Sequence, residues 1–301
     1  MGNGLDIIVD RLFDYAGMFP PAARDFEAAL RESASLSATL KRPFMLNSDL
    51  VLDTKHAGLL CEVDLSSYGF TRDISVSLLI TEKINDSLRI AERIITSIRL
   101  DDKPIVKLAS LETKLPGEGY EGIISTLRDY CQTHALPLAV EPDLSTYSWE
   151  KALSETIDVL RNCSPRVTLK CRGSGPTGVS SERLARAIVS AVDIGIPLKV
   201  TGGFHHPIVE RDRYGNAIGF LNLVVAVMLR HALKTGFTED EIATLLVNPS
   251  STVFSWSNGL TYGAHHLSEQ ALLDAKQKAP FSIGSCSLHE PDDDLARLFP
   301  M

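Results

Sequence analysis

The chain has 301 residues, of which 44% are apolar and 23% are charged, and its formal net charge is −8. These proportions exclude a disordered, collagen-like or coiled-coil chain, and the length fits one α/β barrel with modest additions. The negative charge argues against a nucleic-acid partner, because such a partner needs a basic surface that neutralises phosphates. A small anionic substrate is still compatible with it, since a local site can be positive in an acidic protein.

The sequence contains no run of about 18 apolar residues that would span a bilayer. The N-terminal residues also lack the basic region and the apolar segment of a secretory signal. We therefore expect a cytoplasmic protein with no membrane partner. The five cysteines form no Cys-x-x-Cys pair, so neither a disulfide framework nor a zinc ribbon is predicted. No cofactor is implied.

The N-terminal 40 residues are predicted to form a loop and a helix that cap the rest of the domain. The loop is aromatic and rich in Gly and Pro, and the helix covers 22–40. After it, short apolar runs alternate with helical patterns. The predicted strands are 43–46, 74–79, 105–109, 137–141, 167–170, 198–201, 252–256 and 281–283, with 59–65 as a further candidate. The predicted helices are 82–100, 119–134, 149–163, 180–192, 217–234 and 239–247.

This alternation predicts an α/β fold, namely a (β/α)8 TIM-type barrel that forms a single domain over 1–301. An open, doubly wound sheet is the main alternative. The predicted helix over 217–234 is apolar nearly all round, which indicates either burial within one chain or the interface of a homo-oligomer.

Two neighbouring predicted strands each carry a lysine and then break into glycine. They read Leu169-Lys170-Cys171-Arg172-Gly173 and Leu198-Lys199-Val200-Thr201-Gly202-Gly203. The helix between them makes the strands parallel, so their carboxyl ends lie at the same edge. Two lysines that lie close together lower each other's pKa, which favours a neutral, nucleophilic amine and hence Schiff-base chemistry. The alternative is that each lysine reaches solvent or pairs with a carboxylate.

Other polar residues are expected at the carboxyl ends of the strands, where barrels place their catalytic groups. Glu141 could be a counter-ion or a general base, or a salt bridge that only organises the site. His205 or His206 could move protons, but adjacent histidines on an extended segment point in opposite directions and would not share one metal ion. Residues predicted to bind substrate are Lys107, Arg172, Thr201, Gly202, Gly203, Gly284, Ser285 and Cys286.

These segments, together with Phe281-Ser282-Ile283-Gly284-Ser285-Cys286-Ser287-Leu288, resemble the C-terminal motifs of the deoxyribose-phosphate aldolase group of class I aldolases. The resemblance covers about the C-terminal third of the chain and Glu141. It implies that Lys170 forms the Schiff base, that Lys199 perturbs it, and that Gly202, Gly203, Gly284 and Ser285 line a phosphate site. The family's catalytic aspartate has no counterpart that the sequence identifies. A segment of some eighty residues between Lys199 and the last motif departs from the family pattern.

The sequence therefore predicts an aldolase-like lyase that acts on a small oxo compound, phosphorylated or carboxylated. Arg172 would lower the pKa of Lys170 or bind an acidic substituent. A metal-dependent isomerase or hydrolase is a second hypothesis, with Glu141, Asp143 and His205 or His206 around a divalent cation. A third is a barrel that binds a small anion through its glycine loops without chemistry. Whether Cys171 and Cys286 react or only pack is left open.

Overall fold

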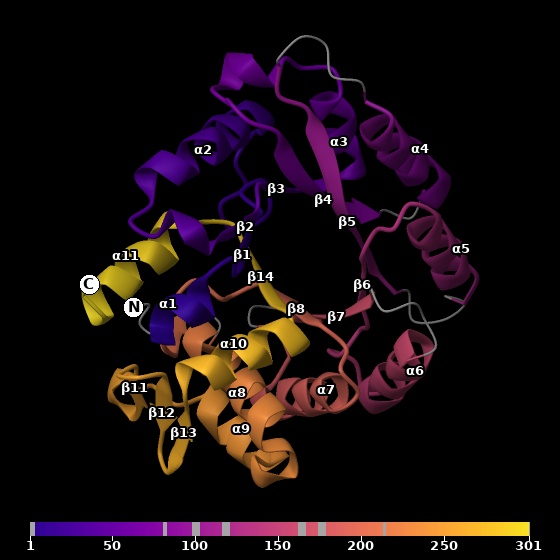
Figure 1. The fold of residues 1–301 in the computed structure, drawn as a ribbon. Coiled ribbons are helices and arrows are strands. Elements are labelled where there is room, and N and C mark those ends of the chain that lie inside the picture. The colour runs from indigo at the N-terminus through magenta and orange to yellow at the C-terminus, as the bar shows by residue number, and fades with distance from the viewer. Residues whose placement is uncertain are drawn as a thin grey trace.

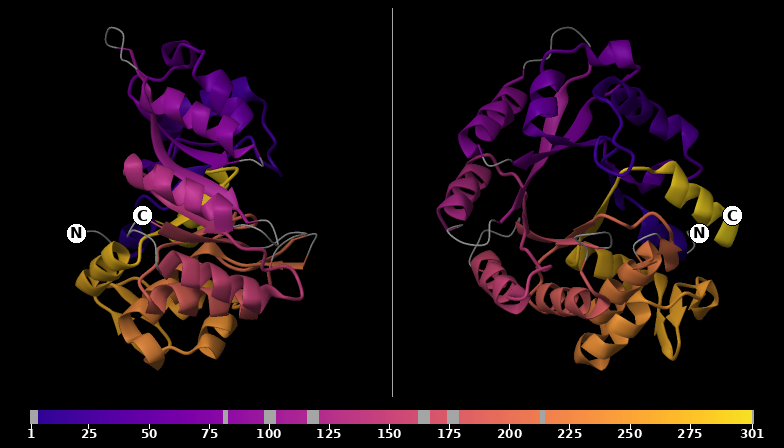
Figure 2. Two further views of the ribbon diagram at one scale, coloured as in Figure 1. Left: turned by 90° about the vertical axis from the view of Figure 1, so that its right-hand side faces the viewer. Right: turned by 180° about the vertical axis from the view of Figure 1, so that it is seen from behind.

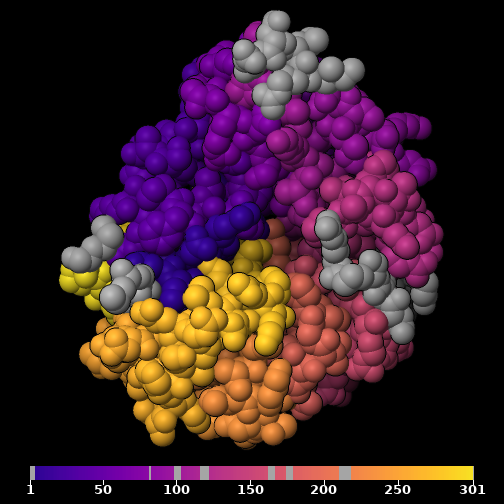
Figure 3. All heavy atoms as spheres, viewed as in Figure 1, coloured from indigo at the N-terminus to yellow at the C-terminus, as the bar shows by residue number. Residues whose placement is uncertain are grey.

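A barrel of parallel strands, surrounded by helices, forms the centre of the molecule (Figure 1). The computed structural model describes residues 4–80, 83–97, 103–115, 121–161, 167–173, 179–212 and 215–300. Successive parts of the chain follow one another around the ring, from indigo through magenta to yellow (Figure 3). The last barrel strand pairs with the first, so the sheet returns to its starting point.

The barrel wall is a nine-stranded sheet in the order β2-β1-β14-β8-β7-β6-β5-β4-β3. β2 and β3 are separated only by Asp49 and pair with β1 and β4, respectively. They therefore share one position in the wall, and the predicted (β/α)8 TIM-type barrel is confirmed. The bounds are β1 (Phe13–Tyr15), β2 (Leu46–Ser48), β3 (Leu50–Asp53), β4 (Ile74–Ile80), β5 (Val106–Lys114), β6 (Leu138–Glu141), β7 (Val167–Arg172), β8 (Leu198–Thr201) and β14 (Phe281–Ser285).

The helices lie on the outside of the ring, as the turned views in Figure 2 also show. The amphipathic spacing seen in the sequence accounts for them, since one apolar stripe of each packs on the wall. Their starts are set by capping, for example at α7, where the Ser180 side chain accepts from Arg183 N. The helices of the ring are α2 (Phe26–Thr39), α3 (Thr54–Leu60), α4 (Ile84–Ile95), α5 (Glu121–Thr133), α6 (Trp149–Arg161), α7 (Ser181–Asp193), α8 (Phe220–Leu233) and α11 (His289–Leu298). A short α1 (Gly4–Val9) precedes β1.

Several sequence predictions of strands need correction. Residues 1–40 are more than a cap, because Phe13–Tyr15 forms β1 inside the wall. The strand expected over 105–109 continues as β5 to Lys114. The run 43–46 is mostly a 3-10 helix, η1 (Pro43–Met45), ahead of β2, and 59–65 is no strand, since it holds the end of α3 and the start of η2 (Leu65–Tyr68). The predicted helices are present, while their expected ends at 82, 98–100, 119 and 162–163 lie outside the described residues.

The long segment between β8 and β14 adds a subdomain to the outside of the barrel. The strand predicted over 252–256 belongs here, to a small antiparallel sheet, and not to the wall. The sheet consists of β11 (Phe254–Ser255), β12 (Leu260–Tyr262) and β13 (His265–Leu267). The other elements are β9 (Glu210–Asp212), β10 (Gly215–Ala217), η3 (Lys234–Gly236), α9 (Glu239–Leu246), η4 (Ser251–Val253) and α10 (Glu269–Lys278).

Helix α8 explains why the sequence around it is apolar on every side. All of its residues from Phe220 to Arg230 are buried, and it packs against α7, α9 and α10. The Arg230 guanidinium, which is also buried, pairs with Asp193 at 2.5 Å. Burial within one chain therefore accounts for the apolar surface of this helix. None of the helices in the described part of the chain has the length and apolar character needed to cross a membrane.

Candidate active site

The two lysines predicted to face one site are direct neighbours inside the barrel. Strands β7 and β8 pair in parallel, and Lys170 lies opposite Lys199 in their register. Both residues are buried. The alternating positions Leu169 and Cys171 belong to the other face of β7, since successive strand residues point to opposite faces, and they are fully buried. The polar face of each strand is therefore turned to the barrel interior.

Lys199 is held by two carboxylates from distant parts of the chain. Its Nζ lies 2.5 Å from Asp14 Oδ2 on β1 and 2.6 Å from Glu112 Oε1 on β5. The other oxygen of Asp14 accepts a hydrogen bond from Asn47 Nδ2 at 2.7 Å. Buried charges need such partners, because an unpaired charge in a dry interior is strongly unfavourable.

Lys170 lies between two carboxylates, that of Glu112, which also contacts Lys199, and that of Glu141. Its Nζ lies 3.0 Å from Glu112 Oε2 and 3.1 Å from Glu141 Oε2. Glu141, at the end of β6, also accepts hydrogen bonds from Arg172 Nε at 3.0 Å and from Arg172 Nη2 at 3.4 Å. The result is a row of alternating charges, buried except for Arg172 at its end, which we call the charge row: Asp14, Lys199, Glu112, Lys170, Glu141 and Arg172.

Glu112 is the centre of the charge row, and its surroundings keep it ionised. Burial alone would raise the pKa of Glu112, but Lys199 and Lys170 outweigh burial and lower that pKa to about 2. Burial alone would likewise lower the pKa of Lys199, but Asp14 and Glu112 more than offset it, so that the pKa lies above its ordinary value. Lys199 is therefore cationic over the physiological range.

This corrects one expectation from the sequence. Two adjacent lysines were predicted to lower each other's pKa, yet the pKa of Lys199 is raised. The reason is that the carboxylates of Asp14 and Glu112 contact its ammonium group, and neither contact is predicted from the sequence. Arg172, which was expected to lower the pKa of Lys170 or to bind an acidic substituent of the substrate, forms an ion pair with Glu141.

The glycine-rich turns predicted to bind an anion lie at the carboxyl ends of two neighbouring strands. Gly202 and Gly203 have φ of 79° and 84°, in the left-handed region that favours glycine. β14 pairs with β8, with Gly284 opposite Thr201, so the two turns are adjacent. The Ser285 hydroxyl is already engaged, since it donates to Ser287 O at 2.6 Å.

The paired histidines do not join the charge row through any contact that we find among the described residues. His205 Nδ1 lies 3.1 Å from Glu290 Oε2, and its Nε2 lies 3.8 Å from Cys286 Sγ. His206 Nδ1 lies 2.6 Å from Asp294 Oδ2. Both acidic partners are on α11, so the histidines tie the loop after β8 to the last helix.

The two cysteines near the site have unreactive surroundings. Burial raises the pKa of the Cys171 thiol and also that of the Cys286 thiol. A raised pKa means little thiolate near neutral pH, and the thiolate is the reactive form.

Lys107 lies apart from the other predicted site residues. Strand β5 begins at Val106, so Lys107 is at its amino end, where it is 63% exposed and pairs with Asp73 at 2.8 Å. The sequence predicts Lys107 near the carboxyl end of its strand because the predicted strand ends at residue 109, whereas β5 continues to Lys114.

Two members of the charge row had been missed as site residues, namely Asp14 and Glu112. Asp14 lies on a three-residue strand within an aromatic loop sequence. Glu112 lies within β5, beyond residue 109, where the predicted strand ends. Its position on the inward face of a parallel strand is the feature that could have identified Glu112 as a site residue.

The residues proposed for a divalent metal ion are not brought together. Glu141 contacts Lys170 and Arg172, whereas the histidines contact α11. No group of three or more His, Cys, Asp or Glu residues in the described ranges could hold a metal ion.

Comparison with known proteins adds no family assignment to this geometry. No protein-family model matches the chain, and no curated protein matches it.

Proposed function

We propose that this protein is a class I lyase of the aldolase type, in which Lys170 forms a Schiff base with a small oxo substrate. The observation that carries the proposal is the placement of Lys170. It is a buried lysine inside a TIM-type barrel, in contact with the carboxylates of Glu112 and Glu141 and opposite a second lysine. A carboxylate in contact with a lysine ammonium group can act as the general base that removes its proton, which makes the amine a nucleophile.

The proposed roles of the carboxylates follow from their different surroundings. Glu112, with a pKa of about 2, is a weak base and stays ionised between the lysines. Glu141 is the remaining carboxylate in contact with the Lys170 ammonium group, at 3.1 Å, and it is the proposed proton acceptor.

In the proposed first step, Lys170 transfers a proton to Glu141, and the neutral amine attacks the carbonyl carbon. The carbonyl oxygen then leaves as water. Both protons of that water come from the former ammonium group, one of them by way of Glu141, and the nitrogen retains one hydrogen in the iminium ion. The iminium nitrogen can accept the electron pair of a breaking C–C bond, which is the function of a Schiff base in a lyase.

The carboxyl end of the barrel offers groups for an acidic substituent of the substrate. Arg172 is 40% exposed there while its guanidinium bonds to Glu141. The Thr201 hydroxyl is buried and has no hydrogen-bond partner within the described parts of the chain. Together with the Gly202-Gly203 turn, these groups could orient a phosphate or carboxylate toward the lysines.

The test is borohydride trapping with a panel of small aldehydes, ketones and 2-oxo acids, followed by intact-mass and peptide mass spectrometry. At least one carbonyl compound of the panel should form one covalent adduct per wild-type chain, and peptide mass spectrometry should locate it on Lys170. The Lys170→Arg variant should give no adduct, while the exposed-site control Lys107→Arg should behave like the wild type. Adducts that persist in Lys170→Arg, or that spread over surface lysines, would refute the proposal.

The same experiment separates catalysis from simple binding. A ligand that binds saturably but gives neither an adduct nor turnover would favour the hypothesis of a non-catalytic barrel that binds small anions.

A further inference from the structure

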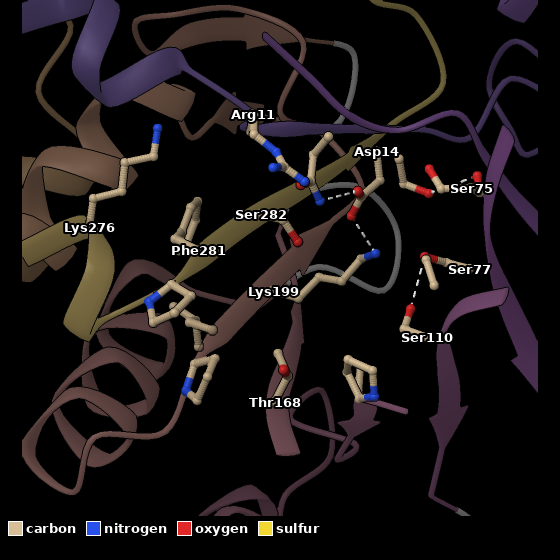
Figure 4. Close-up of a pocket in the computed structure, with 18 residues that line it drawn as sticks. Arg11, Asp14, Ser75, Ser77, Ser110, Thr168, Lys199, Lys276, Phe281 and Ser282 are labelled. Carbon is tan, nitrogen blue, oxygen red and sulfur yellow. Dashed lines mark hydrogen bonds and ion pairs between the residues drawn. The ribbon is translucent and has the colours of Figure 1, made fainter. Parts of the chain in front are cut away.

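The barrel interior is hollow at the amino ends of its strands. A cavity of about 460 Å³ lies there, and it is lined by the first residues of several strands and by the prolines that precede them. The prolines are Pro137, Pro197 and Pro280. Figure 4 shows the Lys199 side chain directed toward Asp14, and these two members of the charge row line one side of the cavity. The face of the molecule that carries α1 and α10 is hollowed near the centre of the ring (Figure 3).

The cavity exists because the inward-facing residues at this end are small. TIM barrels are normally filled here by layers of bulky branched side chains. In this chain the lining residues are small and mostly carry hydroxyl groups: Ser77, Ser110, Ala139, Thr168 and Ser282. The volume is within the range of roughly 300–1,000 Å³ that is typical of small-ligand sites.

The lining offers hydrogen bonds that the protein itself does not use. Ser110 donates to Ser77 at 2.9 Å, but we find no hydrogen-bond partner for the hydroxyls of Thr168 and Ser282 among the described residues. Asp14 also faces the cavity (Figure 4), where it accepts from Lys199 and Asn47. A polar cavity of this kind suits a ligand with several hydroxyl groups better than an apolar one.

A positive charge is available at the cavity's solvent side. Arg11, in the loop before β1, lines the cavity and is exposed. Its guanidinium makes no hydrogen bond or ion pair with the residues that the structure describes. The nearby Lys276 is different, because its ammonium group donates to Ile7 O and lies 3.3 Å from Asp10 Oδ2. The net charge at this opening is therefore positive.

We propose that this amino-terminal cavity is a binding site for a small anion that carries hydroxyl groups, with a carboxylate or phosphate on Arg11. The hydroxyl groups of the ligand would contact Thr168, Ser282 and Asp14. Arginine is suited to the anionic end because its planar guanidinium binds carboxylates and phosphates through paired hydrogen bonds. The cavity shares Asp14 and Lys199 with the charge row but opens at the amino end of the barrel, whereas Arg172 and the Gly202-Gly203 turn lie at the carboxyl end, so anion binding there does not require the lyase chemistry.

The test is isothermal titration calorimetry with four probes: glycerol 3-phosphate, glycerate, inorganic phosphate and glycerol. The two hydroxylated anions should bind saturably to the wild type, and whichever binds more tightly identifies the anionic group. Phosphate alone and glycerol alone should each bind at least tenfold more weakly than the better hydroxylated anion. Equal affinity for inorganic phosphate would contradict the role of the hydroxyl-lined interior.

Variants locate the binding. Arg11→Gln should raise the dissociation constant at least tenfold, because a charge-assisted hydrogen bond is lost. Arg89→Gln, at a 78% exposed arginine on α4, is the matched control and should bind like the wild type. Ala139→Leu should also prevent binding by filling the cavity. Unchanged affinity in Arg11→Gln, or no saturable binding by the wild type, would overturn the proposal.

Borohydride trapping of Arg11→Gln keeps the two proposals apart. This variant should lose anion binding and still give the Lys170 adduct. Loss of both together would show that the cavity and Lys170 belong to a single site, which contradicts a separate anion site.

Discussion

The middle of the barrel and its amino-terminal end are built from opposite kinds of side chain. In the middle, the five buried members of the charge row fill the interior with mutually paired ions: Asp14, Lys199, Glu112, Lys170 and Glu141. At the amino end, small hydroxyl residues leave a cavity of about 460 Å³. Bulky aliphatic residues would stabilise either layer better, because buried ion pairs and voids both reduce stability relative to a well-packed apolar core. The difference indicates that the middle layer is shaped for chemistry and the amino-terminal layer for a ligand.

Removal of Glu112 should have the largest effect on stability. Glu112→Ala leaves Lys199 and Lys170 without their shared carboxylate, and an uncompensated buried charge reduces the free energy of unfolding by about 3–5 kcal/mol. Urea denaturation measures the loss. Asp274→Ala, at an exposed carboxylate on α10, is the control and should change the same quantity by less than about 0.5 kcal/mol. Similar small losses for both variants would show that the charge row does not hold the barrel together.

The stability of the wild type should decrease in acid because of Glu112. Its folded-state pKa is about 2, against an ordinary 4.5, so the folded state binds this proton less readily than the unfolded state. The stabilisation is present above pH 4.5 and is lost as the pH falls toward 2; it amounts to about 3 kcal/mol. Denaturation at pH 5 and pH 3 should show a steeper decrease for the wild type than for Glu112→Gln. Identical slopes would contradict the assignment.

The hollow layer should tolerate a larger side chain that a packed layer would reject. Ala139→Val adds two methyl-sized groups inside the cavity and should raise the free energy of unfolding by about 1 kcal/mol through added apolar burial. Ala187→Val, at a fully buried site on α7, is the matched comparison and should lower it by about 1–3 kcal/mol through overpacking. Destabilisation of equal size at both positions would mean that the amino-terminal layer is not hollow.

The smallest effect is expected at Lys107, the predicted site residue that lies outside both layers. Lys107→Ala removes an exposed ion pair with Asp73, and such pairs contribute less than about 1 kcal/mol. The variant should retain nearly all wild-type stability and the full yield of trapped adduct. A large loss of adduct in Lys107→Ala would indicate that Lys107 contributes to the active site.

The lysine pair could be predicted from the sequence because each lysine follows an apolar run and precedes glycine. Such an apolar run indicates a buried parallel strand, and the helix between the two strands implies that they are parallel with their carboxyl ends at one edge. The partners of the lysines were harder to predict. The inward positions of β5 are polar, so the strand was expected to end at Ala109, before Glu112. Asp14 lies on a three-residue strand, which is too short for a periodic signal.

The amino-terminal cavity could not be predicted from the sequence. A serine or alanine at an inward strand position leaves space only if the facing strands carry small residues in the same layer. That condition depends on the register of neighbouring strands, for example Ser77 opposite Ser110 across a β-bulge. The register is a property of the assembled barrel.

The most direct test of this account is a crystal structure of the borohydride-reduced adduct with the carbonyl compound that traps best. We expect the new bond at Lys170 Nζ, with the ligand extending toward Arg172 and the Gly202-Gly203 turn. Lys199 should remain between Asp14 and Glu112. A bond at Lys199 Nζ, with the ligand in the amino-terminal cavity, would contradict the assignment of Lys170 as the nucleophile and the separation of the two ends of the barrel.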